Sequence, residues 1–246
     1  MKNLQGKVAI ITGASRGIGA AIGKRLAADG AHVIINYSHS EGRANEVVQS
    51  ISAKGGEAKS VQANMRDPEQ IKRLFDETLE TFGRLDILVN NAGMFALKSL
   101  EESTAEDFDE TFELNVRAVF LAAREAAKRM GEGGRIINIG SINGDRMPFP
   151  GGALYGASKA AVAGLTRGWA RDLGPRGITV NCVQPGPIDT DMNQADGELA
   201  GVQKQMTALD RYGKTEEVAA LVAFLASPDS ANITGACLNV DGGTNA

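Results

Sequence analysis

Residues 7–30 read KVAIITGASRGIGAAIGKRLAADG, and this stretch decides the fold. Its first part, residues 7–12, is an apolar and β-branched run of the kind that forms a strand buried on both faces. Residues 18–28 carry apolar side chains at helical spacing, and Gly30 marks the end of that helix. The chain therefore begins with a buried strand, a glycine-rich turn and a helix.

The glycine-rich turn, residues 13–19, predicts a dinucleotide site. Glycines let the chain turn tightly and bring backbone N–H groups and a helix N-terminus close to a pyrophosphate. The spacing Gly-x-x-x-Gly-x-Gly differs from the common Gly-x-Gly-x-x-Gly, and no Gly-Lys-Ser/Thr follows as a P-loop requires. A plain strand-to-helix turn is the alternative, but the position at the first strand–helix junction favours the dinucleotide. The contacts expected from this turn are Gly13, Ser15, Arg16, Gly17, Ile18 and Gly19.

Strands and helices alternate along the rest of the chain, which predicts βαβ units. We expect strands at 32–37, 60–62, 85–89, 135–139, 178–183 and 236–240, and helices at 41–54, 68–82, 105–130, 153–173 and 215–226. The resulting fold is an α/β, Rossmann-type doubly wound parallel sheet of about seven strands with helices on both faces. No Pro-, Ser- or charge-rich linker divides the chain, so we expect residues 1–246 to form a single domain.

Two turn-rich stretches, residues 141–152 and 185–199, each follow a predicted strand directly. Open α/β sheets bind ligands at the carboxyl ends of their strands. These stretches are therefore the candidate walls of a substrate site. The segment from Asp191 to Tyr212 mixes Met, Leu and Tyr with polar residues, which permits a moderately apolar ketone.

Composition excludes several classes of function. The formal charge of −4 argues against a nucleic-acid-binding protein, which needs a basic face. The two cysteines, Cys182 and Cys237, lack metal-ligand spacing and lie in strand-like runs, so buried thiols and no metal site are expected. The apolar run near the N-terminus is too short for a signal sequence or a membrane span. We expect a cytoplasmic protein.

The end of the second strand indicates which dinucleotide binds. An NAD site places an acidic residue there to hold the ribose 2′-hydroxyl, and that acid would repel the 2′-phosphate of NADP. The segment 35–40 reads INYSHS and contains no acid before Glu41. Hydroxyl donors together with Arg16 favour NADP(H), although Arg16 could instead be a solvated loop charge. The contacts expected from this strand end are Asn36, Tyr37 and Ser38.

Lys159 lies four positions after Tyr155 on a predicted helix, so the two side chains share one face of that helix. A nearby ammonium favours a phenolate, which makes a tyrosine more useful in acid–base chemistry near neutral pH. Ser141 ends the fifth strand, where its hydroxyl can lie beside the phenol. Asn115, inside a predicted helix, is either a buried hydrogen-bonded residue or one that bends the helix and holds a water for a proton relay.

These motifs resemble those of the short-chain dehydrogenase/reductase family over nearly the whole chain. The TGASRGIG turn, the NNAG of residues 90–93, the four residues Asn115, Ser141, Tyr155 and Lys159, and Pro185-Gly186 occur in the family's order and spacing. The resemblance implies hydride transfer between NADP(H) and a carbonyl or alcohol, in a dimer or, as we expect, a homotetramer with no nucleic-acid or membrane partner.

The resemblance also implies roles for individual residues. Tyr155 is the general acid, Lys159 lowers its pKa and binds the ribose, Ser141 polarises the carbonyl, and Asn115 anchors the water. Further cofactor contacts implied by the resemblance are Asn64, Met65, Asn91, Ala92, Gly93, Pro185, Gly186, Ile188 and Thr190. Of these, Asn64 stands where the family more often has Asp.

Two branches of the family are most similar to this chain. The NYSHS segment is similar to that of 3-oxoacyl-carrier-protein reductases, whereas residues 144–148 (GDRMP) and 183–191 (VQPGPIDTD) resemble a branch that binds cyclic di-GMP in biofilm dispersal. The complete catalytic set favours a carbonyl reductase. The alternative is a nucleotide-sensing binding protein on the same scaffold.

Overall fold

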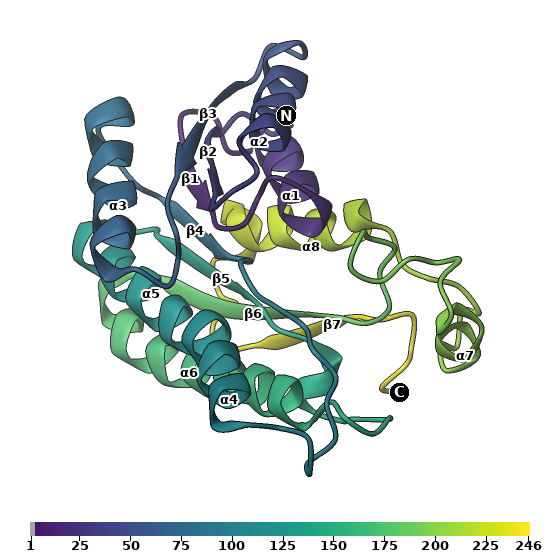
Figure 1. Ribbon diagram of the computed structural model, residues 1–246. Helices are drawn as coiled ribbons and strands as arrows, with labels where there is room; N and C mark the ends of the chain where they lie inside the picture. The colour runs from purple at the N-terminus through teal and green to yellow at the C-terminus, as the bar shows by residue number, and fades with distance from the viewer. Residues whose placement is uncertain (1–2) are drawn as a thin grey trace.

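The computed structural model describes residues 3–246, and in it seven parallel strands form one sheet in the order β3-β2-β1-β4-β5-β6-β7 (Figure 1). The strands are β1 Val8–Ile11, β2 His32–Tyr37, β3 Glu57–Gln62, β4 Ile87–Asn90, β5 Arg135–Ile139, β6 Thr179–Pro185 and β7 Cys237–Val240. Strands β1, β4, β5 and β6 are buried along their whole length, as their apolar runs predict. The predicted doubly wound parallel sheet is confirmed.

Helices cover both faces of the sheet (Figure 1). One apolar layer packs the sheet against α1 (Gly17–Ala28), α2 (Glu41–Ser52) and α8 (Thr215–Ala226). The other layer packs it against α3 (Pro68–Phe82), α5 (Ala118–Arg129) and α6 (Ala153–Leu173). Both layers consist mainly of small and branched aliphatic side chains.

The strand order reverses between β1 and β4, and this reversal positions the site. From β1 the chain first adds β2 and β3 on one side, then returns to add β4 and all later strands on the other. Connections on the two sides leave in opposite directions, so a crevice forms at the carboxyl ends of the strands. The segment after β6, with the short helix α7 (Ala200–Gln205), extends beyond the sheet near the C-terminus (Figure 1).

The structure corrects three details of the sequence-based expectations. The helix expected at 105–130 is instead α4 (Ala105–Phe112), a π-helical turn (Glu113–Arg117) and α5. The strand expected at 60–62 is β3, which already begins at Glu57. An edge strand can expose polar side chains, so a search for apolar runs misses the polar start of β3. Cys182 is buried as expected, but Cys237 lies on the edge strand β7 and is only half-buried.

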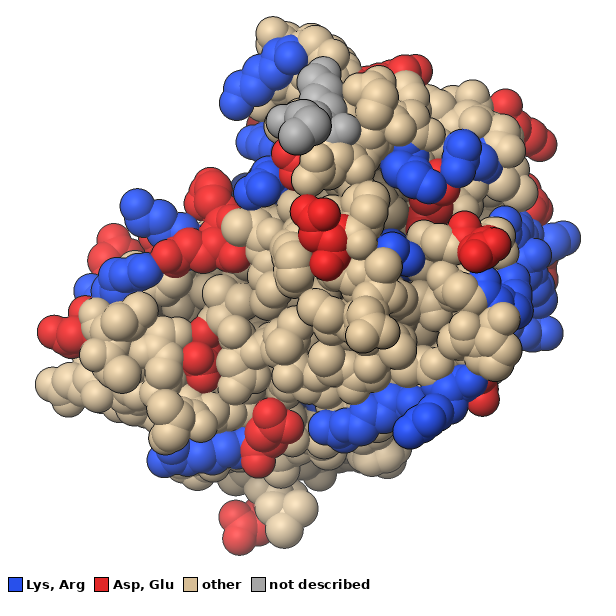
Figure 2. Space-filling model, turned by 180° about the vertical axis from the view of Figure 1, so that it is seen from behind, with Lys and Arg blue, Asp and Glu red and all other residues tan. Residues whose placement is uncertain are grey.

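Among residues 3–246, no helix is both long and apolar enough to cross a membrane, and no group of His, Cys, Asp and Glu is arranged to hold a metal ion. The first two residues of the N-terminal segment lie outside the described residues. On the face seen from behind, basic side chains are interspersed with acidic ones (Figure 2). In this view basic side chains gather along the right and lower edges, with acidic ones among them.

The packing of Gly19 gives a test of how tightly the glycine turn is built. A Cβ added to Gly19 would lie 2.5 Å from Asn91 Nδ2 and 2.7 Å from the carbonyl oxygen of Gly13. We expect Gly19→Ala to lower the free energy of unfolding by about 1–3 kcal/mol, as overpacking does, measured by urea denaturation. The control is Gly42→Ala, because a Cβ there meets nothing within 4 Å. Equal stability of the two variants would contradict the close packing.

Candidate active site

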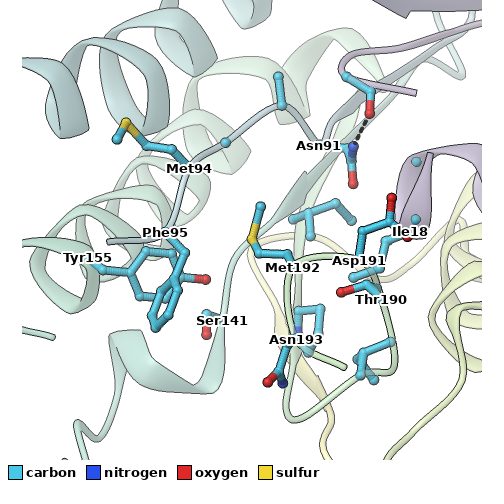
Figure 3. A pocket seen from close by; sticks show the side chains of 18 of the residues that line it. Ile18, Asn91, Met94, Phe95, Ser141, Tyr155, Thr190, Asp191, Met192 and Asn193 are labelled. Carbon is cyan, nitrogen blue, oxygen red and sulfur yellow. Dashed lines mark hydrogen bonds between the residues drawn. The ribbon is translucent and has the colours of Figure 1, made fainter. Parts of the chain in front are cut away.

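A cavity of about 630 Å³ opens at the carboxyl ends of the strands (Figure 3). Its walls come from the turn after β1, the end of β2 and the segments after β3, β4, β5 and β6. Every site residue expected from the sequence lines it, except Asn115. These residues are Gly13, Ser15, Arg16, Gly17, Ile18, Gly19, Asn36, Tyr37, Ser38, Asn64, Met65, Asn91, Ala92, Gly93, Ser141, Tyr155, Lys159, Pro185, Gly186, Ile188 and Thr190.

Side chains from two other strands hold the glycine turn in place. Asn91 Nδ2 donates to the carbonyl oxygens of Thr12 and Gly13, at 2.9 and 3.0 Å. Asn36 Oδ1 accepts from the N–H of Gly13 at 3.2 Å, while its Nδ2 donates to the carbonyl oxygens of Val61 and Ala63. Both asparagines line the cavity as expected, and their side-chain amides form hydrogen bonds to the backbone of the turn.

The glycine turn has a backbone conformation that favours glycine, packs closely against Ala92 and leads directly into helix α1. Gly13 and Gly17 have φ of +61° and +55°, a conformation that favours glycine. A Cβ on Gly13 would lie 2.9 Å from Ala92 Cα. Helix α1 begins at Gly17, so its unpaired N–H groups lie at the cavity wall. This geometry suits an anionic group such as a pyrophosphate.

The end of β2 carries an unpaired donor. Ser38 Oγ is buried and has no hydrogen-bond partner among the described residues. Arg16, His39 and Ser40 line the cavity too, and the last two were not among the contacts expected from the sequence. Of the described residues that line the cavity, only Asp191 is acidic. A buried hydroxyl and a guanidinium that line the same cavity fit a phosphate group, whose oxygens accept from both.

Tyr155, Ser141 and Lys159 meet at the opposite end of the cavity. Figure 3 shows the Tyr155 ring directed towards Ser141. Burial raises the pKa of Tyr155, and a hydrogen bond with the Ser141 hydroxyl acts in the opposite direction. Lys159 Nζ lies 5.7 Å from the centre of the Tyr155 ring and donates to the carbonyl oxygen of Ile139 at 2.9 Å. Burial lowers the pKa of Lys159 to about 8.

These pKa directions differ from the sequence-based expectation. Lys159 was expected to lower the pKa of Tyr155, but burial dominates and raises it. The sequence could indicate that both side chains share a helix face. It could not indicate how far the fold buries each of them, and burial disfavours phenolate and ammonium alike.

Asn115 lies behind the cavity wall, within the π-helical turn. Its Oδ1 accepts from the N–H of Met94 at 2.8 Å, and its Nδ2 donates to the carbonyl oxygen of Met94 and to Ser158 Oγ. Ser158 Oγ in turn donates to the carbonyl oxygen of Tyr155. Asn115 therefore connects the segment after β4 to α6. The structure shows Asn115 buried and hydrogen-bonded within a π-helical turn, and its role in holding a water stays a prediction.

Apolar residues form a wall next to Tyr155. Phe95 packs edge-on against Tyr155, with ring centres 4.9 Å apart (Figure 3). The other apolar side chains of this wall are Met94, Leu114, Phe149, Met192, Leu199 and Met206. Phe149 lies in the stretch 141–152 that was expected to form a wall of the site, whereas Phe95 was not identified from the sequence. Leu209 and Tyr212 lie outside the wall, and Tyr212 instead donates to Gln203 Oε1 at 2.6 Å.

Known proteins resemble this chain over nearly its full length. A sequence family described as enoyl-(acyl carrier protein) reductase matches residues 13–245. A cyclic-di-GMP-binding biofilm dispersal mediator protein of Escherichia coli (strain K12) is 46% identical over 96% of each chain. A 3-oxoacyl-[acyl-carrier-protein] reductase of Synechocystis is also 46% identical, over 99% of this chain and 98% of its own. The crystal structure of a short-chain dehydrogenase from Burkholderia cenocepacia in complex with NADP is 55% identical, with a TM-score of 0.97 over 99% of this chain and 100% of that chain.

Proposed function

The chain belongs to the short-chain dehydrogenase/reductase family of oxidoreductases, and from this premise we propose that it is an NADPH-dependent carbonyl reductase that interconverts ketones and secondary alcohols. The observation that carries the proposal is the cavity itself, in which a glycine turn and the Tyr155–Ser141–Lys159 group face a common space. In this proposal residues 1–246 act as a single NADP-binding domain.

The proposed cofactor contacts follow the length of the cavity. The turn from Gly13 to Gly19 would hold the pyrophosphate, and Arg16 with Ser38 would hold the 2′-phosphate. Asn64 and Met65 would lie at the adenine. Asn91, Ala92 and Gly93 would lie along the ribose nearer to the adenine. Pro185, Gly186, Ile188 and Thr190 would hold the carboxamide end. NADPH, when bound, supplies the hydride for the carbonyl carbon.

Proton transfer is assigned to Tyr155. Because burial raises its pKa, the phenol stays protonated at neutral pH and can donate its proton to a developing alkoxide. Ser141, whose hydroxyl lies beside the phenol, would donate a hydrogen bond to the same substrate oxygen. Lys159 would bind the cofactor ribose and stabilise the phenolate that remains after proton transfer.

The apolar wall supports a substrate with an apolar body. Phe95, Phe149 and Met206 can cover such a group, while Tyr155 and Ser141 address a single oxygen. The Synechocystis relative acts, by its name, on 3-oxoacyl groups carried by an acyl carrier protein. We therefore propose a ketone or 3-oxoacyl-type substrate. A cytoplasmic homotetramer is proposed with it, supported by the family and by the exposed Phe108 and Phe120.

A second candidate function is the sensing of cyclic di-GMP. The E. coli relative that supports it is named for this binding and is 46% identical. Calorimetry with cyclic di-GMP tests the candidate directly. Binding in the micromolar range, displaced by NADPH, would support a sensor that uses the same cavity. The absence of heat at millimolar ligand would remove this candidate.

Removal of the phenol hydroxyl tests the reductase. We expect Tyr155→Phe to reduce NADPH oxidation over a panel of ketones and 3-oxoacyl thioesters by about 10²-fold or more, since proton donation contributes about that much. NADPH affinity, followed by calorimetry, should change little. A Tyr212→Phe variant serves as the control, because Tyr212 lies outside the cavity wall. Full activity of Tyr155→Phe would overturn the mechanism.

The pKa of Lys159 predicts a limb in the pH profile. Burial lowers this pKa to about 8, so the ammonium is present below that pH and lost above it. The Tyr155 phenol stays protonated in the same range because its own pKa is raised. We expect kcat/KM for NADPH, which reports groups of the free enzyme, to be level below pH 8 and to fall above it. Lys159→Arg should lose this limb, because a guanidinium keeps its charge. A wild-type profile that is level up to pH 10 would contradict the assignment.

A further inference from the structure

Two arginines from different elements share one carboxylate at the mouth of the cavity. Asp191 Oδ2 lies 2.8 Å from Arg43 Nη1 and 3.5 Å from Arg16 Nη1. Arg16 belongs to the glycine turn, Arg43 to the first turn of α2, and Asp191 to the segment after β6. The fold thus brings together two cations and one anion from three separate parts of the sequence.

The shared carboxylate places Arg43 next to the proposed phosphate site. Arg16 and Asp191 both line the cavity, and so does Ser38 with its unpaired hydroxyl. Since both guanidiniums contact the same oxygen atom, a group that Arg16 can reach through Nη1 lies within reach of Arg43 as well. Arg43 itself is not part of the cavity wall, which explains why neither the motif nor the cavity lining points to it.

The charges of this cluster are unbalanced. Two guanidiniums face one carboxylate, so one positive charge stays uncompensated. A phosphate monoester carries about −1.5 to −2 at neutral pH and three acceptor oxygens, which matches two guanidiniums better than a carboxylate does. The side chains of Arg16, Arg43 and Asp191 are all more than half exposed, at 57%, 53% and 58%. Ion pairs this exposed are weak and readily exchanged.

The position of Asp191 connects this exchange to the segment after β6. A Cβ added to Gly17 would lie 3.7 Å from Thr190 Cγ2, so this segment lies against the glycine turn. Asp191 is the neighbour of Thr190, and Figure 3 shows both residues close to Ile18 of the glycine turn. The carboxylate thus contacts the two guanidiniums from the segment after β6, which lines the cavity.

We propose that Arg43 is a second residue that reads the 2′-phosphate of NADPH, and that Asp191 holds Arg16 and Arg43 in the free protein and competes with that phosphate for them. This inference rests on the proposed preference for NADPH. It assigns the discrimination between NADPH and NADH to three side chains, one of which acts against binding. Asp191 therefore lowers the affinity for NADPH while keeping the phosphate-binding guanidiniums in place.

Calorimetric titration with NADPH and NADH tests the inference, with adenosine 2′,5′-bisphosphate and 5′-AMP as probes for the phosphate alone. We expect Arg43→Ala to weaken NADPH and the bisphosphate by about 10- to 100-fold, the range for hydrogen bonds to charged groups, and to leave NADH and 5′-AMP unchanged. Asp191→Asn should strengthen NADPH by about two- to fivefold, as for an exposed ion pair, again without an effect on NADH. Arg43→Lys should restore part of the lost affinity.

The controls and the contrary outcomes are distinct. Arg25 and Asp29 form an ion pair on α1 at 2.9 Å, away from the cavity wall, so Arg25→Ala and Asp29→Asn should alter neither cofactor. If Arg16→Ala weakens NADPH selectively but Arg43→Ala does not, the inference is overturned while the NADPH preference stands. If Arg16→Ala weakens NADPH and NADH equally, the proposed preference itself is wrong. Weaker NADPH binding by Asp191→Asn would overturn the competition.

In the Arg16→Ala, Arg43→Ala double variant, the gain from Asp191→Asn should disappear, because no guanidinium remains to be released. A gain that persists would mean that Asp191 acts through other contacts, which would also overturn the competition. Thermal unfolding followed by circular dichroism checks that each variant is folded, and all three side chains are exposed enough for substitution to be tolerated.

Discussion

The site depends on the hydrogen bonds that fix the glycine turn between its neighbouring strands. Buried backbone polar groups need partners, and a turn rich in glycine has few side chains of its own to supply them. Asn36 from β2 and Asn91 from the end of β4 meet this need by binding Gly13 from both sides. The turn is thereby held open, with its N–H groups and the start of α1 facing the cavity. The space around it is so narrow that a methyl group on Gly19 would collide with Asn91.

A second constraint acts at the other end of the cavity, where Lys159 is buried and Tyr155 is partly buried. Burial raises one pKa and lowers the other, and both shifts reduce charge in the absence of a ligand. The two groups are held by their neighbours: Lys159 by the carbonyl oxygen of Ile139, and Tyr155 by the edge contact with Phe95. The π-helical turn at Asn115 fixes the segment after β4 against α6 and so supports the same wall.

Charged side chains line several parts of the cavity: Arg16 and Asp191 lie at its mouth, Arg66 contacts Met94, and the buried Lys159 lies beside Tyr155. The apolar wall lies next to Tyr155 as well. Such a cavity suits a long ligand with an anionic part and an apolar part. The segment after β6 reaches both parts of the cavity, since Asp191 lies at the mouth and Met192 belongs to the apolar wall (Figure 3).

Most strands and helices and most residues of the site could be predicted from the sequence alone. Apolar runs and helical spacing predicted the seven strands and most helices, because a parallel sheet buried on both faces needs continuous apolar strands. Local motifs predicted the glycine turn, Ser141, Tyr155 and Lys159, since each lies where a strand ends or on one helix face. The polar start of the edge strand β3, the helix α7 and the π-helical turn within residues 105–130 were hidden, because exposed or short elements leave weak patterns. Only the tertiary structure determined the raised pKa of Tyr155, the edge contact of Phe95 and the meeting of Arg16, Arg43 and Asp191. Burial and contacts between residues as far apart as Arg43 and Asp191 depend on how the whole chain packs, and no local spacing in the sequence encodes them.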